Sequence, residues 1–495
     1  MIEGQTSIFE MLYPTFKFTK PIRLIEFFAG YGSQALALKY LGVDFEHWKI
    51  CEWATKSIQA YKDLHFENDN TDYSKDIDKD TLIDILYELG ISSNYNSPMT
   101  KKQIQRLNDG NLRKIYNNIF ATHNLVNIQQ IKGEDLCVED TDKFTYLLTY
   151  SFPCQDLSLA GNGKGMSDTT TRSGLLWEVE RVLTECKNKP QVLLMENVPQ
   201  VHGTDNVEDF NKWQLRLEEM GYKNYWQDLI ATDYGIPQTR NRCFMVSILG
   251  DYNYTFPKPI PLKLKLKDML EDNVDEKYYL SDKMIECLQS ESDNSKFPRK
   301  ERFFQTLKTT NEKGIAATLC TTGGTRPTDN YIINKHLRET FEQREEPIKD
   351  GSYIDSYNRK IRDDDLASTL STRVNSSNDT YIAIKTANKK GYIEANEGDG
   401  VDISSRMQYH RGTVQKGKTQ TITTMGGENN GVVLKDLKIR KLTPKECFRL
   451  MGVKDEDFDK VKKKQSDSSL YHLAGDSIVV NVLIAIFREM LWKDI

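Results

Sequence analysis

The sequence predicts an α/β fold in which a mostly parallel sheet, covered by helices, is followed by a smaller β-rich domain and a helical tail. From residue 22 to about 249, short apolar runs alternate with helix-like stretches, the pattern of parallel strands joined by helices. Beyond about residue 255 the composition shifts to Thr, Gly and Asn, and helical periodicity returns after residue 442. A chain of 495 residues is long enough for two hydrophobic cores.

The first domain, residues 20–255, is expected to contain five strands and one helical insertion. The insertion covers residues 63–130, where charged residues and apolar residues at helical spacing carry no catalytic signature. The strands are the five apolar runs Arg23–Phe28, His47–Cys51, Tyr146–Tyr150, Val192–Met195 and Cys243–Leu249.

Residues 256–435 are expected to form the second domain, because a Thr-rich motif recurs there. Thr318, Thr369 and Thr421 hold equivalent places in it, 51 and 52 residues apart, and an aliphatic run follows each copy. Recurring β-hairpins with Gly- or Asn-rich tips explain this period, and a coincidence of Thr-rich loops is the alternative. Residues 436–495 are expected to return to the first domain, since residues 477–490 have the periodicity of a buried helix.

Composition indicates a globular protein and excludes several classes. Hydrophobic residues make up 38% and charged residues 28%, which argues against global disorder. No run reaches membrane-spanning length and the start has no leader pattern, so we expect a cytoplasmic protein without membrane attachment. Eight cysteines without a C-x-x-C pair predict neither a disulfide framework nor a metal site. The net charge of −5 decides nothing about nucleic acid, because phosphate contacts need only a local basic face.

The first two predicted strands end in residues suited to a nucleotide-like ligand. Phe28, Ala29, Gly30 and Gly32 follow the first strand, and the glycines let the backbone turn tightly and approach a ligand. Glu52 lies 22 residues after Gly30, where nucleotide-binding folds place a carboxylate for ribose hydroxyls. The alternative is a strand-to-helix turn with a surface glutamate.

Reactive side chains follow the third and fourth strands, and two arginines lead directly into the fifth. Cys154 comes after the third strand in a proline turn, ahead of a glycine-rich loop suited to a lid, whereas the other cysteines are expected to be buried thiols. Glu196 follows the fourth strand against an apolar floor, and burial of that kind raises a carboxyl pKa. Arg240 and Arg242 are two apart and so share a face, which suits phosphate or carbonyl oxygens. Structural ion pairs are the alternative for the acid and the arginines.

In this order the motifs resemble those of the cytosine-5 DNA methyltransferase family, across roughly 300 residues of the first domain and the tail. Phe-x-Gly-x-Gly is similar to the cofactor loop, Pro-Cys-Gln to the nucleophile, Glu-Asn-Val to the base-protonating site and Gln-x-Arg-x-Arg to the eighth motif. Residues 440–446 and 475–482 are similar to the segment after the recognition domain and to the last motif. The resemblance implies a Rossmann-like domain that uses S-adenosyl-L-methionine, with S-adenosyl-L-homocysteine as product.

The resemblance also implies a catalytic role for five residues. Cys154 bonds to ring carbon 6 of a cytosine rotated out of duplex DNA, and Glu196 steadies the ring at nitrogen 3. Arg242 contacts the base carbonyl, Arg240 supports the loop, and Gln155 belongs to the loop that closes over the base. The β-rich domain becomes the target-recognition domain, reading bases in the major groove.

For the cofactor, the resemblance implies that Glu52 holds the ribose hydroxyls, that Trp53 flanks the adenine and that Leu136 also belongs to the cofactor site. The remaining implied cofactor residues are Phe28, Ala29, Gly30, Gly32, Asp135, Ser477 and Asn481. Two positions depart from the family pattern. The chain reads Gly-Glu-Asp-Leu at 133–136 where the family has Gly-Asp-Ile, which leaves Glu134 or Asp135 to bind the adenine amino group. Asp476 replaces a common Asn.

Duplex DNA is the partner that the resemblance implies, with a cognate restriction endonuclease where one accompanies the enzyme, and we expect a monomer. A related branch that methylates transfer RNA is the nearest alternative, but its recognition part is much smaller than residues 256–435. A catalytically silent DNA-binding regulator is the other alternative. The intact Cys154, Glu196 and Arg242 argue against it.

Overall fold

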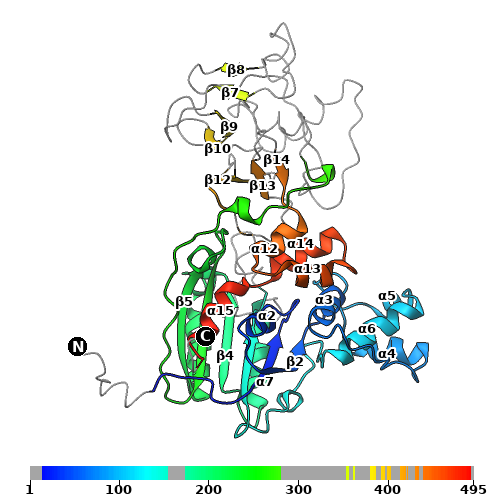
Figure 1. Ribbon diagram of the computed structural model, residues 1–495. Coiled ribbons are helices and arrows are strands. Elements are labelled where there is room, and N and C mark those ends of the chain that lie inside the picture. Colours follow the sequence, from blue (N-terminus) through cyan, green and yellow to red (C-terminus); the bar gives the residue numbers. More distant parts are fainter. Residues whose placement is uncertain are drawn as a thin grey trace. The chain divides into compact units, whose positions relative to one another are not determined.

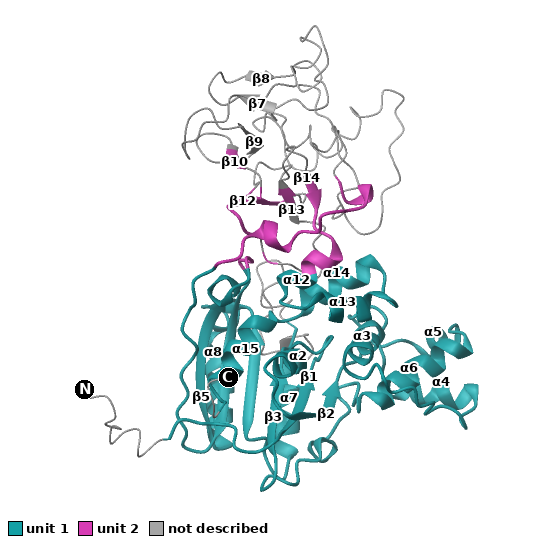
Figure 2. Ribbon diagram, in the orientation of Figure 1, with its two compact units in different colours: residues 1–236, 240–262, 448–495 teal, residues 237–239, 263–447 magenta. Residues whose placement is uncertain are grey.

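The computed structural model describes residues 14–153, 173–279 and 439–491, and short segments between residues 353 and 433. Contacts divide the chain into two compact units (Figures 1 and 2). Unit 1 comprises residues 1–236, 240–262 and 448–495, and unit 2 comprises residues 237–239 and 263–447.

Unit 1 is built on a six-stranded sheet with the order β2-β1-β3-β4-β6-β5. β1, β2, β3 and β4 run parallel to one another, and β6 runs antiparallel to both β4 and β5. The Rossmann-like, mostly parallel α/β fold is therefore confirmed. The strands are β1 (Ile22–Phe27), β2 (Phe45–Cys51), β3 (Thr145–Tyr150), β4 (Val192–Asn197), β5 (Tyr222–Ile230) and β6 (Asn241–Leu249).

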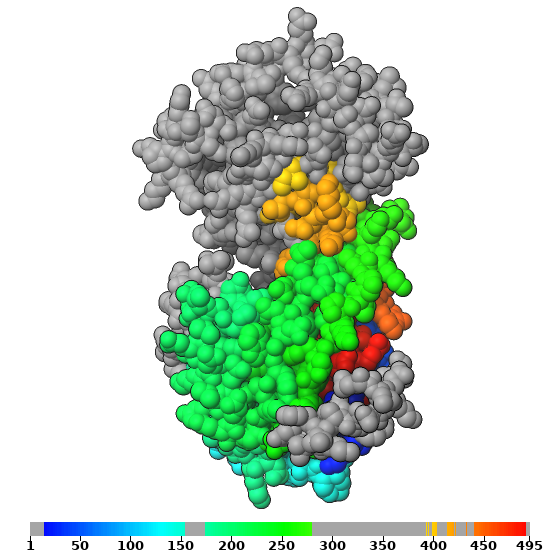
Figure 3. Space-filling view, turned by 90° about the vertical axis from the view of Figure 1, so that its left-hand side faces the viewer, coloured from blue at the N-terminus to red at the C-terminus, as the bar shows by residue number. Residues whose placement is uncertain are grey.

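The five strands predicted from apolar runs are all present, but a sixth strand, β5, was not predicted. β5 forms the edge of the sheet, and most of its residues are half-buried or exposed, so it carries no long apolar run. Figure 3 looks onto this side of the protein, where the green surface of β5 and its neighbours faces the viewer. Because β6 is antiparallel, the amino end of β6 lies at the same edge of the sheet as the carboxyl ends of β1 to β4.

Helices cover both faces of this sheet. α7 (Leu176–Glu185) and α8 (Val207–Glu219) bury Val179, Val182, Trp213 and Leu217 against β1, β3, β4 and β6 in one core cluster. On the other face, α2 (Ser33–Tyr40) and α15 (Val480–Arg488) lie side by side. The tail therefore contributes a core helix to the first unit.

Residues 63–130, the predicted insertion, contain three helices with a core of their own. These are α4 (Lys79–Glu88), α5 (Lys101–Gln105) and α6 (Asp109–Ala121), which project beside α3 (Thr55–His65) in Figure 1. Side chains of α4 and α6 and the following loop form a separate hydrophobic cluster with α3. Asp78 caps α4 and Asn108 caps α6 by accepting hydrogen bonds from first-turn backbone groups.

The described strands of unit 2 pair antiparallel, and the unit also contains the 3-10 turns η5 (Leu266–Met269) and η6 (Glu276–Tyr278). One four-stranded sheet has the order β10-β9-β7-β8 and the other has the order β12-β11-β13-β14. Two aliphatic runs that follow the Thr-rich motif lie in β9 and β13, and the motif copies at 318 and 369 lie outside the described residues. The strands are β7 (Tyr353–Asp355), β8 (Lys360–Arg362), β9 (Thr380–Lys385), β10 (Tyr392–Ala395), β11 (Gly400–Asp402), β12 (Val414–Gln415), β13 (Asn430–Val433) and β14 (Ile439–Lys441).

The tail contains one stretch, Asp467–Arg488, that is long and apolar enough to cross a membrane. The expectation that no segment reaches this length is therefore wrong by that measure. The stretch consists of two helices, α14 (Asp467–Asp476) and α15, and 72% of its apolar window is buried inside the protein. It is packed as core helices. α12 (Pro444–Leu450) and α13 (Asp455–Lys462) precede it.

Candidate active site

The glycine-rich turn after β1 has a left-handed backbone at three positions. Phe28, Gly30 and Gly32 have φ angles of 56°, 57° and 84°. A Cβ on Gly32 would lie 2.5 Å from His65 Nε2 and 2.6 Å from the Tyr61 ring, so no side chain fits there. A left-handed φ is unusual for a residue such as Phe28, and strain of this kind concentrates at ligand sites.

Glu52 faces this turn from the end of β2. Its carboxylate accepts hydrogen bonds from Gly30 N at 3.0 Å and from Ala54 N at 2.7 Å. The Asn124 side chain bonds both the backbone N–H and the carbonyl of Glu52 and fixes its place. Burial raises the pKa of Glu52 to about 7, and the Asp476 carboxylate adds to the rise. Each carboxylate oxygen keeps capacity for a further donor.

A short 3-10 turn, η1 (Gly133–Leu136), carries the candidate adenine residues. Asp135 accepts a hydrogen bond from Lys132 N at 2.7 Å, whereas the Glu134 side chain is exposed and lies 3.8 Å from the Lys132 ammonium. The carbonyl of Leu136 accepts a hydrogen bond from Trp48 Nε1 at 2.8 Å. This hydrogen bond connects η1 to Trp48 in β2.

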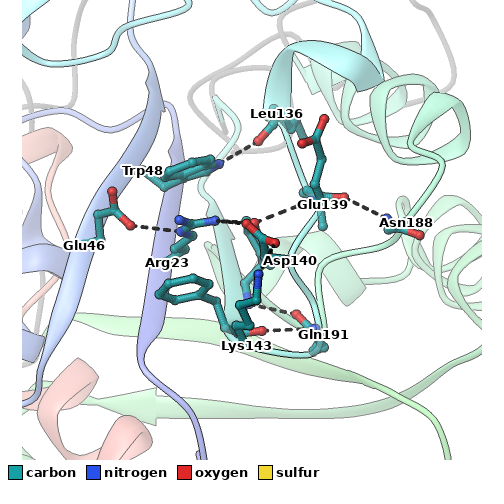
Figure 4. A network of polar contacts seen from close by, with 12 residues as sticks. Arg23, Glu46, Trp48, Leu136, Glu139, Asp140, Lys143, Asn188 and Gln191 are labelled. Atoms are coloured by element: carbon teal, nitrogen blue, oxygen red, sulfur yellow. Dashed lines mark hydrogen bonds and ion pairs between the residues drawn. The ribbon is translucent and has the colours of Figure 1, made fainter.

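Trp48 is itself held by a stacked arginine (Figure 4). The Arg23 guanidinium lies 3.8 Å from the Trp48 ring centroid and 3.7 Å from that of Phe144. Glu46 and Asp140 pair with the same guanidinium at 2.9 and 3.5 Å. Because cation–π contacts and charge-assisted hydrogen bonds act on one planar group, the indole has little freedom to turn.

Glu196 and Arg242 meet where β4 ends and β6 begins. Arg242 Nε lies 3.1 Å from Glu196 Oε1, and the Glu196 side chain is 9% exposed. Burial raises the pKa of Glu196, and the guanidinium groups of Arg242 and Arg240 act against that rise. The sheet thus brings together the acid and the two arginines that the sequence singled out.

A residue at the end of β4 also holds the segment between β3 and Cys154. Asn197 Nδ2 donates a hydrogen bond to the carbonyl of Phe152 at 3.0 Å, two residues before the cysteine. Cys154 and Gln155 lie outside the described residues. Of the described cysteines, Cys51, Cys186, Cys243 and Cys447 are buried and Cys137 is half-buried.

The tail reaches the same edge through its last motif. Arg240 Nη2 donates to the carbonyls of Gly475 and Ser477 at 3.1 and 2.8 Å. Ser477 Oγ lies 4.0 Å from the place of a Cβ on Gly30, which sets it against the glycine turn. Asn481, predicted beside the cofactor, donates to the carbonyl of Tyr234 at 3.3 Å. Asp476, the departure from the family pattern, pairs with His472 at 2.9 Å.

Sequence reasoning missed three residues that hold the site. Asn197 belongs to the Glu-Asn-Val motif, so its place after the fourth strand could be predicted from the sequence. Its hydrogen bond to the carbonyl of Phe152 could not. Asn124 and Trp48 act through backbone groups 72 and 88 residues away. Side chain to backbone contacts over such separations leave no local pattern.

Comparisons with known proteins point to one family. A family model described as C-5 cytosine-specific DNA methylase matches residues 87–492. The chain is 30% identical over 473 residues to the type II methyltransferase M2.ScrFI of Lactococcus lactis subsp. cremoris, covering 95% of this chain and 99% of that protein. It is 39% identical over 267 residues to the orphan methyltransferase M.SssI of Spiroplasma monobiae, covering 53% and 68% of the two chains. The orphan methyltransferase M.SPRI of Bacillus phage SPR is 26% identical over 413 residues, covering 75% and 88%.

Proposed function

The chain belongs to the family of C-5 cytosine-specific DNA methylases and is a DNA (cytosine-5-)-methyltransferase, and from this premise we propose how its residues perform the reaction. The observation that carries the proposal is the pair of buried Glu196 and partly buried Arg242. Next to Glu196, Asn197 donates a hydrogen bond to the carbonyl of Phe152, two residues before Cys154. An acid and a cation at the edge of the sheet to which the chain before Cys154 is bonded suit nucleophilic addition to an electron-poor ring.

Cys154 is the nucleophile in this proposal. Its thiolate forms a bond to carbon 6 of cytosine, and the electron pair of the ring's 5,6 double bond moves toward carbon 5, which becomes nucleophilic. After methylation of carbon 5, a base removes the proton there, the 5,6 double bond re-forms and the thiolate leaves. Carbon 6 is inaccessible in stacked DNA, so the cytosine is rotated into the pocket at a cost of a few kcal/mol.

Glu196 and Arg242 steady the charge that this addition creates. A carboxyl with a raised pKa holds a proton that ring nitrogen 3 can share, so negative charge pushed into the ring is stabilised there. Arg242, whose Nε lies 3.1 Å from Glu196 Oε1, is assigned to the carbonyl oxygen of the same base. Arg240, bonded to two carbonyls of the tail, supports the loop, and Gln155 belongs to the segment that covers the base.

The residues around the glycine turn fit S-adenosyl-L-methionine. Among the described residues, a Cβ on Gly30 would meet only Ser477 Oγ, at 4.0 Å, so this part of the turn is open, and the Glu52 carboxylate has acceptor capacity for two ribose hydroxyls. Gly32 is assigned to the same turn, where His65 and Tyr61 pack against it. Phe28, Trp53 and Leu136 are assigned to the adenine, with Asp135 rather than the exposed Glu134 as acceptor for its amino group. Ala29, Ser477 and Asn481 complete the assigned set. When bound, this cofactor supplies an electrophilic methyl group.

Cofactor binding is expected to weaken as the pH falls through 7. The pKa of Glu52 is raised to about 7, so the ribose acceptor is ionised above that pH and protonated below it. The Kd for the cofactor should therefore rise below pH 7, approaching tenfold per pH unit. Isothermal titration calorimetry between pH 6 and 8 measures this rise.

Two variants make that test specific. Glu52→Gln should bind about tenfold or more weakly at pH 8, because charge-assisted hydrogen bonds are lost, and its Kd should be flat with pH. Glu134→Gln, which changes an exposed carboxylate, should behave as the wild type. A pH dependence that persists in Glu52→Gln would assign it to another group, such as the buried Glu26, whose pKa is also raised to about 7.

Trp48→Phe is expected to weaken cofactor binding without changing the chemical step. The phenyl ring keeps the stack on Arg23 but loses the hydrogen bond to Leu136, worth about 0.5–1.5 kcal/mol. The KM for the cofactor should rise about two- to tenfold with kcat unchanged. Steady-state kinetics measure both, and Trp226→Phe, at an exposed tryptophan, is the matched control. A fall in kcat with normal KM would contradict this role.

The remaining assignments follow from the substrate. Duplex DNA is the partner, and residues 256–435 are assigned to target recognition through the major groove. We place the enzyme in the cytoplasm as a monomer, with a cognate restriction endonuclease as partner if the relationship to type II methyltransferases extends to their setting.

Bisulfite sequencing of DNA from cells expressing the protein tests the proposed function. Methylcytosine should appear in one sequence context with the wild type and be absent with Cys154→Ala. Methylation of transfer RNA in place of duplex DNA would favour the RNA branch. An absence of methylcytosine from the DNA of cells that express the wild-type protein would contradict the function itself.

A further inference from the structure

Three side chains from separate segments converge beside β6, outside the proposed catalytic set. They are His202 in the turn η3 (Pro199–His202), Asp228 in β5 and Cys243 in β6. Their ligand atoms all lie within 4.8 Å of one another, and His202 Nε2 is 2.9 Å from Asp228 Oδ1. One nitrogen, one carboxylate oxygen and one sulfur therefore face a common point.

The sheet register and ring packing hold these three residues in place. Asp228 and Cys243 are direct partners across the antiparallel pair β5 and β6, so their side chains share a face. Cys243 is also the partner of Asn197 in β4. The His202 ring packs against Trp226 at 4.7 Å and Phe210 at 6.2 Å between centroids. Preformed donors lower the cost of ordering a binding site.

The donor set matches the chemistry of a zinc-like ion. Zinc binds imidazole nitrogen and carboxylate oxygen at about 2.0–2.2 Å and thiolate sulfur at about 2.3 Å, so a tetrahedral ion sets its ligand atoms about 3.3–3.8 Å apart. The present distances, 2.9 Å between His202 Nε2 and Asp228 Oδ1 and at most 4.8 Å within the group, bracket that spacing. The His202 and Asp228 side chains are 24% and 32% exposed, which leaves an entry path and room for a water as fourth ligand.

We propose that His202, Asp228 and Cys243 bind one divalent transition-metal ion of the zinc class. On binding, neutral His202 donates Nε2, the Asp228 carboxylate donates an oxygen, and the Cys243 thiol loses its proton and donates the thiolate. The ion links the segment after β4 to β5 and β6. The three ligands lie 26 and 15 residues apart in the sequence, so they do not form a recognisable metal-binding motif. The sequence therefore predicted no metal.

The site adjoins the proposed base pocket without sharing its residues. Cys243 follows Arg242, and its partner Asn197 follows Glu196, but the side chains of neighbouring strand residues point to opposite faces. The ion is therefore assigned a structural effect, stabilising the segment between Asn197 and His202. This inference does not depend on the catalytic roles proposed above.

Cobalt titration of the full chain tests the site, with Co²⁺ as a spectroscopic probe. Metal-free protein should develop a sulfur-to-cobalt charge-transfer band that saturates at one ion per chain and disappears when Zn²⁺ is added. Cys243→Ala should lose the band. Asp228→Asn and His202→Gln should bind Co²⁺ at least tenfold more weakly. Zn²⁺ should raise the thermal unfolding midpoint of the wild type and not that of Cys243→Ala.

Matched variants separate this site from other thiols. Cys154→Ala and Cys137→Ser should both keep the band, since neither residue belongs to the group. Asp228 is partly exposed, so Asp228→Asn keeps the test valid if Cys243→Ala fails to fold. No band in the wild type, or an unchanged band in both Cys243→Ala and Asp228→Asn, would overturn the proposal.

Discussion

Cys154→Ala is expected to reduce methyl transfer to duplex DNA by at least about 10⁴-fold, because removing the nucleophile of a covalent mechanism leaves only binding and positioning. Pro153, Cys154 and Gln155 resemble the nucleophile motif of the family, and Asn197 donates a hydrogen bond to the carbonyl of Phe152 just before them. Transfer of labelled methyl groups from the cofactor to duplex DNA measures the effect.

Two controls show that the loss concerns chemistry. Cys447→Ala, at a buried thiol of α12 that belongs to neither assigned set of residues, should keep full activity. Cys154→Ala itself should bind the cofactor with unchanged Kd, since no residue of the glycine turn is altered. Substantial turnover by Cys154→Ala would show that the sulfur is not the nucleophile.

Glu196→Gln is expected to lower kcat by about 10²- to 10³-fold while the KM for the cofactor changes little. Glutamine keeps the size of the side chain but cannot share an acidic proton with the ring. Arg242, 3.1 Å from the acid, also loses its charged partner. Single-turnover rates on saturating DNA measure the chemical step directly. Glu219→Gln, on the exposed end of α8, is the control.

The pH profile gives a second readout for Glu196. Because burial raises the pKa of this carboxyl, the protonated form persists to higher pH than for an exposed glutamate, and the rate should decline as pH rises through that raised pKa. The thiolate of Cys154 has the opposite requirement, so the wild-type profile is bell-shaped. Glu196→Gln should lose the declining limb. A variant that keeps this limb would contradict the assignment.

The parallel strands and the site residues beside them were predictable because short, continuous sequence patterns encode both. Buried parallel strands are continuous apolar runs, and the residues that follow them must share one edge of the sheet. Glu196 lies at the end of such a strand, whereas Arg242 lies at the start of its own strand and reaches the same edge because β6 is antiparallel, a direction that the sequence did not predict. β5 was missed because an edge strand such as Tyr222–Ile230 alternates little and is mostly half-buried or exposed.

What the sequence could not supply are contacts between distant segments. Asn124 clamps the backbone of Glu52, and Trp48 binds the carbonyl of Leu136, through pairings that depend on the completed fold. The group of His202, Asp228 and Cys243 is of the same kind. Asp476 was recognised as a departure from the family pattern, but its pairing with His472 and its effect on Glu52 appear only in three dimensions.

The covalent bond between enzyme and base is tested most directly with duplex DNA in which the target cytosine carries fluorine at carbon 5. Fluorine blocks the last elimination, so in the presence of cofactor the wild type should form an adduct that survives denaturation, and peptide mass spectrometry should locate it at Cys154. An active enzyme that forms no such adduct, or an adduct of equal yield on Cys154→Ala, would contradict the mechanism.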